Sequence, residues 1–227
     1  MKIIAHAHTD FPTKFGIPRQ SGVIPELTAQ IVFKPEYRNP ESLRGLEDFS
    51  HLWLIWKFSE AERDEWSPTV RPPRLGGNKR MGVFATRSPF RPNPIGLSCV
   101  QLDKIEWSTP NGAILHVSGI DLMNGTPIYD IKPYIPYTDN RPDATSGFVG
   151  RDEARLVSTI TNVDFPGYLL QKIPQEKREA LLAVLANNPR PSYQNNPERV
   201  YGLEFAGFDV RFVVDGNRLT VVDLRYF

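Results

Sequence analysis

The first 137 residues contain short runs of β-branched and aromatic residues, separated by turns rich in glycine and proline. This pattern predicts strands and not helices. The expected strands span residues 2–7, 30–34, 52–58, 82–85, 97–107 and 113–120. Asn111 and Gly112 tolerate positive φ and predict a hairpin turn between the last two strands. Because closure hides the edges of short strands, we expect a small antiparallel β-barrel.

The C-terminal third follows a different pattern. Residues 175–186 come after Pro174 and end before Pro189, and they keep a set of apolar side chains on one face, which predicts a helix. The set is Ala180, Leu181, Val184 and Leu185. Residues 208–214 alternate in polarity and 219–224 return after a turn at Asp215 and Gly216, which predicts two strands. A weaker helical pattern spans residues 40–48.

The polar, aperiodic residues 139–147 predict a linker or an ordered surface loop. We therefore expect a mainly β chain with an α+β extension. A small antiparallel β-barrel domain would span residues 1–150, and a small α+β C-terminal domain would span residues 151–227. No two glycines stand two positions apart, so the G-x-G-x-x-G fingerprint is absent and a Rossmann fold is not expected.

The composition limits the classes of protein that fit. The formal net charge is +1, so binding to nucleic acid would require segregated charge and not an overall basic chain. Cys99 is the only cysteine, which excludes an intrachain disulfide and a multi-cysteine zinc site, and we expect it to be a buried small hydrophobe. Apolar runs are too short for a signal peptide or a membrane span, so we expect a cytoplasmic protein without membrane contact.

The stretch between Trp66 and Leu102 contains no aspartate or glutamate, but it is rich in proline and in basic residues. The basic residues are Arg71, Arg74, Lys79, Arg80, Arg87 and Arg91. Proline fixes φ and removes backbone donors, so these side chains should lie on stiff, extended turns. A guanidinium binds carboxylate or phosphate through two parallel hydrogen bonds. The stretch predicts an anion-binding surface, and a merely solvated basic loop is the alternative.

Two other features could carry chemistry. His6 and His8 face the same side of an expected strand, and Asp10 could supply a third ligand, which leaves a metal-dependent hydrolase as one alternative. Histidines near a terminus are more often ordinary polar strand residues, so we expect no metal. Residues 52–56 (LWLIW) are expected to form a buried strand, which leaves Trp66 as the tryptophan that could stack on a nucleotide base.

Five stretches together resemble a known family. They are residues 18–22 (PRQSG), 44–53 (RGLEDFSHLW), 82–96 (GVFATRSPFRPNPIG), 130–134 (DIKPY) and 189–193 (PRPSY). In amino-acid sequence and in their order along the chain, they are similar to the TrmO family, also called TsaA or YaeB. Residues 6–11 (HAHTDF) depart from it, because family members more often show an Ile-x-Ser-Pro-Tyr-like run there.

The resemblance implies a tRNA N6-methyltransferase that uses S-adenosyl-L-methionine on a β-barrel. The implied substrate is the adenosine at position 37, beside the anticodon, already bearing a threonylcarbamoyl group on N6. It also implies a homodimer that binds the tRNA anticodon loop. The cofactor contacts carried over by motif are Pro18, Arg19, Gln20, His51, Leu52, Arg87, Leu97, Asn124, Gly125, Thr126 and Pro127.

The chemistry of that substrate suggests further roles. Its carboxylate and phosphates suit the basic stretch, and the substrate contacts we expect are Arg71, Arg74, Lys79, Arg80, Arg91 and Asn93. A ureido nitrogen is a poor nucleophile until it loses its proton, so a base is wanted. Asp130, Lys132 and Tyr134 stand two apart and would share one face of a strand, which makes them the expected catalytic residues. An ordinary solvated strand remains the alternative, as does a noncatalytic module that binds S-adenosyl-L-methionine or RNA.

Overall fold

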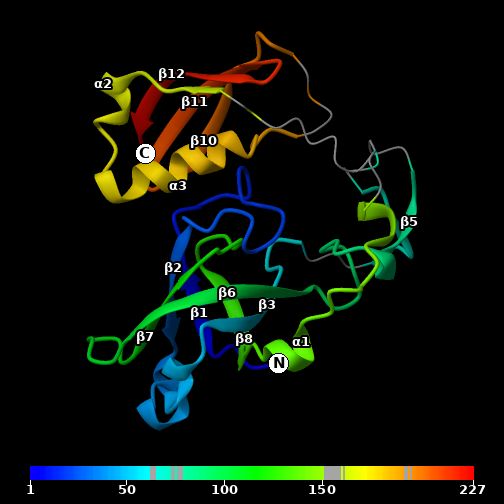
Figure 1. Ribbon diagram of the computed structural model, residues 1–227, viewed down its shortest axis with the longest axis vertical. Coiled ribbons are helices and arrows are strands. Elements are labelled where there is room, and N and C mark those ends of the chain that lie inside the picture. Colours follow the sequence, from blue (N-terminus) through cyan, green and yellow to red (C-terminus); the bar gives the residue numbers. More distant parts are fainter. Residues whose placement is uncertain are drawn as a thin grey trace. The chain divides into compact units, whose positions relative to one another are not determined.

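The protein is represented by a computed structural model that describes residues 1–61, 65–72, 75, 79–150, 160, 162–191, 194 and 196–227. The chain forms two compact units (Figure 1). The barrel unit comprises Met1–Thr9, Arg19–Val70 and Arg80–Thr145. The second unit comprises Asp10–Pro18, Arg71–Lys79 and Ser146–Phe227. The domain division expected at residue 150 stays a prediction, since residues 151–159 lie outside the described part.

The barrel unit contains a closed barrel with strand order β1-β2-β7-β6-β3-β8, in which every neighbouring pair is antiparallel. The strands are β1 (Ala5–His8), β2 (Thr28–Phe33), β3 (His51–Lys57), β6 (Ile95–Glu106), β7 (Ile114–Ser118) and β8 (Thr126–Pro133). The predicted barrel is confirmed. A doubly wound Rossmann sheet would be parallel, so its exclusion is confirmed as well.

The barrel core follows from strict alternation along the strands, because successive side chains point to opposite faces. In β3 the side chains of Leu52, Leu54 and Trp56 are buried, while Trp53 and Ile55 are only partly buried on the outer face. The expectation of a buried strand over residues 52–56 is therefore right only for the three side chains that point into the barrel. The barrel interior is otherwise filled by apolar side chains such as Ile31, Leu115, Val117 and Ile128.

Several expected elements differ in detail. Residues 82–85 form only the end of β5 (Met81–Gly82), which pairs with β4 (Thr69–Val70), and then a 3-10 turn, η5 (Val83–Ala85). The expected helical stretch at 40–48 consists of two 3-10 turns. These are η2 (Pro40–Leu43) and η3 (Leu46–Asp48), and a further turn, η1 (Pro35–Tyr37), precedes them. Gly45 separates η2 from η3 with φ of +81°, a left-handed conformation that breaks a helix.

The hairpin turn predicted at Asn111 and Gly112 is confirmed. Gly112 has φ of +78°, and its N–H donates to the Thr109 carbonyl at 3.0 Å. After β8, the barrel unit continues into the short helix α1 (Pro136–Asp139). None of the described helices combines the length and apolar character that crossing a membrane requires.

The second unit is a four-stranded sheet with order β10-β11-β12-β9 and a helix, α3, that was predicted. Its elements are η6 (Gly147–Gly150), β9 (Asn162–Asp164), α2 (Gly167–Leu170), α3 (Gln175–Ala186), β10 (Tyr201–Phe205), β11 (Phe208–Asp215) and β12 (Arg218–Tyr226). All four apolar residues expected on the inner face of α3 are buried. They share the core of this unit with sheet residues such as Leu203, Val210 and Phe212.

The segment Asp10–Pro18 belongs to this second unit although it precedes most of the barrel in the sequence. The Ala206 N–H donates to the Asp10 carbonyl at 2.9 Å, and the ring of Phe11 lies 5.2 Å from that of Phe205. Phe11 and Phe205 are both buried. The segment therefore completes the core of the second unit.

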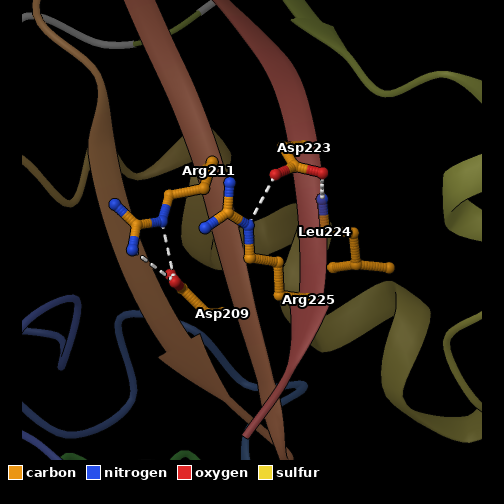
Figure 2. A network of polar contacts seen from close by, with 5 residues as sticks. All are labelled: Asp209, Arg211, Asp223, Leu224 and Arg225. Carbon is orange, nitrogen blue, oxygen red and sulfur yellow. Dashed lines mark hydrogen bonds and ion pairs between the residues drawn. The ribbon is translucent and has the colours of Figure 1, made fainter.

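Alternating side chains of β11 and β12 form a polar face on the same sheet (Figure 2). Arg211 donates from Nε to Asp209 Oδ2 at 2.7 Å, and Arg225 does the same to Asp223 Oδ2 at 2.7 Å. The hydrogen bond from Arg225 is the main reason why the pKa of Asp223 is lowered. Because the register sets Asp209 opposite Arg225 and Arg211 opposite Asp223, opposite charges also face each other between strands.

Candidate functional site

The outward side chains of β6, β3 and β8 form the surface that we call the outer barrel face. Ile55 of β3 pairs with Leu97 of β6 on one side and with Asp130 of β8 on the other. This row joins an expected cofactor contact to an expected catalytic residue. Strands lie about 4.8 Å apart, so the backbones of Leu97 and Asp130 are about 10 Å apart. Leu97 is 54% exposed, so the row is open to a ligand.

A β-bulge decides which side chains of β8 reach this face. The register shifts between Ile55, opposite Asp130, and Trp56, opposite Ile128, so that Tyr129 is an extra residue. Before the bulge Ile128 points into the barrel, and after it Ile131 takes the inward phase opposite Leu54. Without the extra residue, the alternation would turn Asp130 inward. The bulge therefore presents Asp130 and Lys132 outward.

The three expected catalytic residues lie on this face together. Lys132 Nζ is 3.1 Å from Asp130 Oδ2, and both side chains are substantially exposed. Tyr134 continues the ladder, because its N–H donates to the His51 carbonyl at 2.9 Å. The Tyr134 ring lies 5.7 Å from the ring of Trp53 and 6.2 Å from that of His51. The outer barrel face thus combines an ion pair with a group of aromatic rings.

Helix α1 is tied to the same face through Trp53. The Trp53 Nε1–H donates to Asp139 Oδ2 at 3.0 Å, and the Ile135 N–H donates to the same oxygen at 2.9 Å. The bond from Ile135, followed by the bond from Trp53, lowers the pKa of Asp139. Neither Trp53 nor Asp139 was expected at the site. Their contact depends on the pairing of β3 with β8, because α1, which carries Asp139, follows β8 in the chain.

Cys99 occupies the row beside Trp53 and Lys132. The expectation of a buried core cysteine is wrong, because the alternation of β6 places Ser98 inward and Cys99, partly buried, outward. Burial, and next the charge of Asp139, raises the pKa of the thiol. A raised pKa keeps the thiol protonated and unreactive.

A second group of expected cofactor residues meets beside β6. The Arg87 guanidinium donates to the Gln20 side-chain oxygen, and both Arg87 and Arg19 are exposed. The neighbouring Ser21 hydroxyl accepts a hydrogen bond from the Cys99 N–H at 3.0 Å. This bond anchors residues 19–21 along the strand that carries Leu97. The structure therefore brings Gln20 and Arg87 together.

A buried polar chain that the sequence did not predict supports this loop. Trp56 Nε1–H donates to Ser98 Oγ at 2.9 Å, and Ser98 donates to Asp121 Oδ1 at 2.6 Å. Burial raises the pKa of Asp121 to about 6, opposed by hydrogen bonds from Ser98, from its own backbone and from the Ser21 backbone, and by the charge of Arg87. The only signal in the sequence was one acid among the apolar residues 119–122.

The other expected cofactor residues lie toward opposite ends of β8. At its start, Gly125 N–H donates to the Ala7 carbonyl at 2.8 Å, and Asn124 Oδ1 accepts from the Thr9 N–H at 3.2 Å. Thr126 is buried, and Pro127 pairs with His6 on β1. His51 and the fully buried Leu52 lie at the far end of β8, where Leu52 pairs with Pro133. Pro133 lies six positions after Pro127 in the sequence, which is about 20 Å along the strand.

The expected substrate contacts are distributed over both units. In the barrel unit, Arg80 donates from Nη1 to Thr69 Oγ1 at 3.0 Å, Arg91 donates to the Thr86 carbonyl at 3.1 Å, and Asn93 is exposed. Two others, Arg71 and Lys79, belong to the second unit and are exposed, and Pro18, an expected cofactor contact of the same unit, is buried. Arg74 lies outside the described residues.

The histidines of β1 lie side by side on its outward face, as expected. Burial, followed by the charges of His8 and Lys34, lowers the pKa of His6. Asp10, the suggested third ligand, instead forms an ion pair with Lys177 at 2.6 Å in the second unit. Among the described residues there is no group of three or more side chains with the arrangement of a metal site.

Comparisons with known proteins agree with these features. Residues 6–140 match the model of the tRNA-methyltransferase O N-terminal domain, and residues 160–226 match that of the TrmO C-terminal domain. An Escherichia coli tRNA (adenine(37)-N6)-methyltransferase is 40% identical over 208 residues, covering 90% of this chain and 88% of that protein. A Pyrococcus abyssi relative with S-adenosyl-L-methionine binding in its name is 34% identical over 173 residues, covering 72% and 88%.

A solved structure gives the same result for the whole fold. The crystal structure of TrmO from Pseudomonas aeruginosa superposes with a TM-score of 0.76 at 32% identity, over 98% of this chain and 97% of that one. The two matched domain models together cover most of the sequence and include all five of the resembling stretches. The chain belongs to the TrmO family.

Proposed function

We propose that this chain transfers a methyl group from S-adenosyl-L-methionine to N6 of adenosine 37 in tRNA. Membership of the TrmO family and the reaction named for the Escherichia coli relative support this activity. The structural observation that supports it most is the row across the outer barrel face, in which Ile55 separates Leu97 from Asp130. That row provides an apolar surface beside a carboxylate that is accessible to solvent.

The residues of this face suit the chemistry of the cofactor. S-adenosyl-L-methionine has a sulfonium cation, a carboxylate and an adenosine, and when bound it supplies an electrophilic methyl group. The electron-rich rings of Trp53 and Tyr134 attract a cation. The exposed Arg87 guanidinium, already oriented by Gln20, suits a carboxylate. The exposed Leu97 offers apolar contact for an adenosine.

We propose that the acceptor adenosine already carries a threonylcarbamoyl group. In this proposal Asp130 accepts the proton that the ureido nitrogen must lose. Lys132, paired with Asp130 at 3.1 Å, keeps that carboxylate in place and offers a cation to the threonyl carboxylate. Tyr134 orients the substituent from its position against Trp53. Correct alignment of donor and acceptor would supply much of the acceleration.

Contacts to the RNA are proposed for the basic side chains. In the barrel unit these are Arg80 and Arg91, together with Asn93, which follows Arg91 by two residues. Each of the two arginines already donates a hydrogen bond within the protein. The roles of Arg71, Arg74 and Lys79 stay predictions. A tRNA substrate would be found in the cytoplasm, where we expect the protein to act.

We also propose that two copies of the chain associate. The expected cofactor residues of one copy lie toward both ends of β8, about 20 Å apart, which is long for the contacts of one small molecule. The exposed apolar side chain of Ile95 on β6 adds surface that association would cover. Sedimentation equilibrium would give twice the mass of the chain if this proposal is right.

The experiment that tests the function is mass spectrometry of tRNA nucleosides from cells with and without the gene. We expect the doubly modified nucleoside, with methyl and threonylcarbamoyl groups on N6, to disappear with the gene and the unmethylated form to accumulate. Return of the chain should restore it. If the nucleosides are identical in the two strains while the purified protein still binds S-adenosyl-L-methionine, a noncatalytic binding module is the better description.

A further inference from the structure

Two large aromatic side chains on the barrel unit lie against each other with tilted rings while remaining open to solvent. The ring centroids of Trp66 and Phe84 are 6.1 Å apart, and the ring planes differ by 31°. Trp66 is 51% exposed and Phe84 is 72% exposed. The Arg91 guanidinium carbon lies over the Phe84 ring, 5.9 Å from its centroid. We call Trp66, Phe84 and Arg91 the aromatic platform.

The platform rests on an ordered backbone. The Val83 N–H donates to the Pro68 carbonyl at 2.9 Å, and Val83 is buried, which fixes the residue just before Phe84. The β4–β5 ladder pairs Thr69 with Gly82 and so joins the segment after Trp66 to the one before Phe84. Arg91 is held by its bond to the Thr86 carbonyl at 3.1 Å. These bonds mean that little backbone order has to be gained on binding.

Clustered exposed apolar side chains are one mark of an interaction site. The neighbouring charge shows which partner is favoured. The platform lies within the acid-free stretch between Trp66 and Leu102, and Arg80 and Arg87 are also exposed there. Flat rings followed by an acid-free stretch of cations suit single-stranded nucleic acid, whose bases stack while its phosphates are neutralised, although the exposed Glu65 directly precedes Trp66. Double-stranded RNA offers no free base face for such stacking.

We propose that the aromatic platform binds an unpaired base of the tRNA anticodon loop by stacking, with Arg91 contributing a cation–π and phosphate contact. The identity of the RNA rests on the proposed function. The platform shares no residue with the outer barrel face, to which Leu97, Asp130 and Tyr134 belong. Its role is to hold the loop while a neighbouring adenosine reaches the methyl donor.

The test is binding of an anticodon stem-loop RNA to the full chain, with 2-aminopurine in the loop as a reporter of stacking. In the parent, the fluorescence should be quenched on binding. Phe84→Ala should weaken the affinity about 5- to 100-fold and abolish most of the quenching. Phe84→Tyr keeps a flat ring and should bind like the parent. Phe84→Leu keeps apolar volume without the ring and should behave like alanine.

Two controls isolate the stacking. Trp107→Ala removes another exposed tryptophan of the barrel unit, which is 44% exposed, and should leave the affinity unchanged. Binding of a fully duplex RNA should be the same in the parent and in Phe84→Ala, because phosphate contacts remain. Affinity for S-adenosyl-L-methionine, measured by calorimetry, should also be unchanged and would show that each variant is folded.

The outcomes separate this proposal from the proposed function. If Phe84→Ala and Phe84→Leu bind and methylate like the parent, the platform proposal is wrong while the enzyme assignment stands. If the parent binds the stem-loop through the platform but methylates no tRNA, the enzyme assignment fails and the platform stands. If Phe84→Ala changes the sedimenting mass and leaves RNA affinity intact, the platform is an interface between copies and the proposal is overturned.

Discussion

Asp130 is the residue on which the proposed chemistry depends most. Asp130→Asn keeps the shape of the side chain and removes its charge, together with the ion pair to Lys132. Because a general base contributes about 10² to 10⁴ in rate, we expect the single-turnover rate of methylation to fall by that order. Both side chains are exposed, so stability should change little. Affinities for tRNA and for S-adenosyl-L-methionine should stay close to those of the parent.

Two results would change the role of Asp130. An equal loss of rate and of affinity would mean that the residue organises the site and takes no proton. Full activity in Asp130→Asn would leave alignment of donor and acceptor as the sufficient cause of catalysis.

Arg87 should be required for binding the cofactor. Its guanidinium contacts Gln20, and a carboxylate left without its charged donor costs about 1 to 3 kcal/mol. We expect Arg87→Ala to weaken binding of S-adenosyl-L-methionine by about tenfold or more in calorimetry. Arg44→Ala is the matched control, because Arg44 is an exposed arginine of the same unit paired with Glu41. Equal affinities in the two variants would remove Arg87 from the site.

Asp121 should make stability depend on pH. Its pKa is raised from 3.8 to about 6 in the folded protein, so folding favours the protonated carboxyl. The resulting stabilisation is complete below about pH 4 and is lost as the pH rises through about 6. A shift of this size corresponds to about 3 kcal/mol. Asp121→Asn cannot ionise and should lack this loss.

The check is urea unfolding of both proteins at several pH values across that window. The free energy of unfolding of the parent should decrease relative to that of Asp121→Asn as the pH rises. Parallel curves for the two proteins would show that Asp121 titrates normally and is not confined by Ser98 and the Ser21 backbone.

At the scale of the elements, β6 must pass close to a tryptophan of the barrel core. A Cβ added to Gly96 would lie 2.2 Å from the ring of Trp56, which is buried and bonded to Ser98. The ring cannot move aside easily, so Gly96→Ala should lower the free energy of unfolding by about 1 to 3 kcal/mol. Gly82→Ala is the control, because a Cβ there would meet nothing within 4 Å. Equal stability of the two variants in urea titrations would contradict this packing.

Most strands could be predicted from the sequence because alternation and turn residues are local signals. Four of the six barrel strands overlap their expected ranges closely, and helix α3 spans the predicted residues 175–186. The strand expected at 82–85 was largely wrong, because its residues close a 3-10 turn, with the Thr86 N–H bonded to the Val83 carbonyl. The bulge at Tyr129 could not be predicted, since it exists only in the pairing of β8 with β3.

The candidate site was partly predictable for the same reason. The spacing of Asp130, Lys132 and Tyr134 predicted a shared face, and the structure brings them onto one. The contributions of Trp53, Asp139 and Asp121 depend on contacts between residues more than 20 positions apart. Such contacts follow from strand order and loop packing, which one sequence does not reveal.

At the scale of the whole molecule, charge is segregated and not in excess. The net charge is only +1, but an acid-free stretch of the chain carries six arginines and lysines. Of those in the barrel unit, Arg80 and Arg87 are exposed and Arg91 is partly buried. This distribution allows an RNA to be attracted to one part of the protein without making the chain basic overall.

The central claim is that the chain itself moves a methyl group from S-adenosyl-L-methionine to N6 of adenosine 37. The most direct measurement uses the purified chain, S-adenosyl-L-methionine labelled in the methyl group, and tRNA with or without the threonylcarbamoyl group. We predict that label appears on N6 of adenosine 37 in the threonylcarbamoyl tRNA, and that Asp130→Asn greatly slows its appearance. Absence of label from tRNA that the protein demonstrably binds, with the cofactor also bound, would contradict the account.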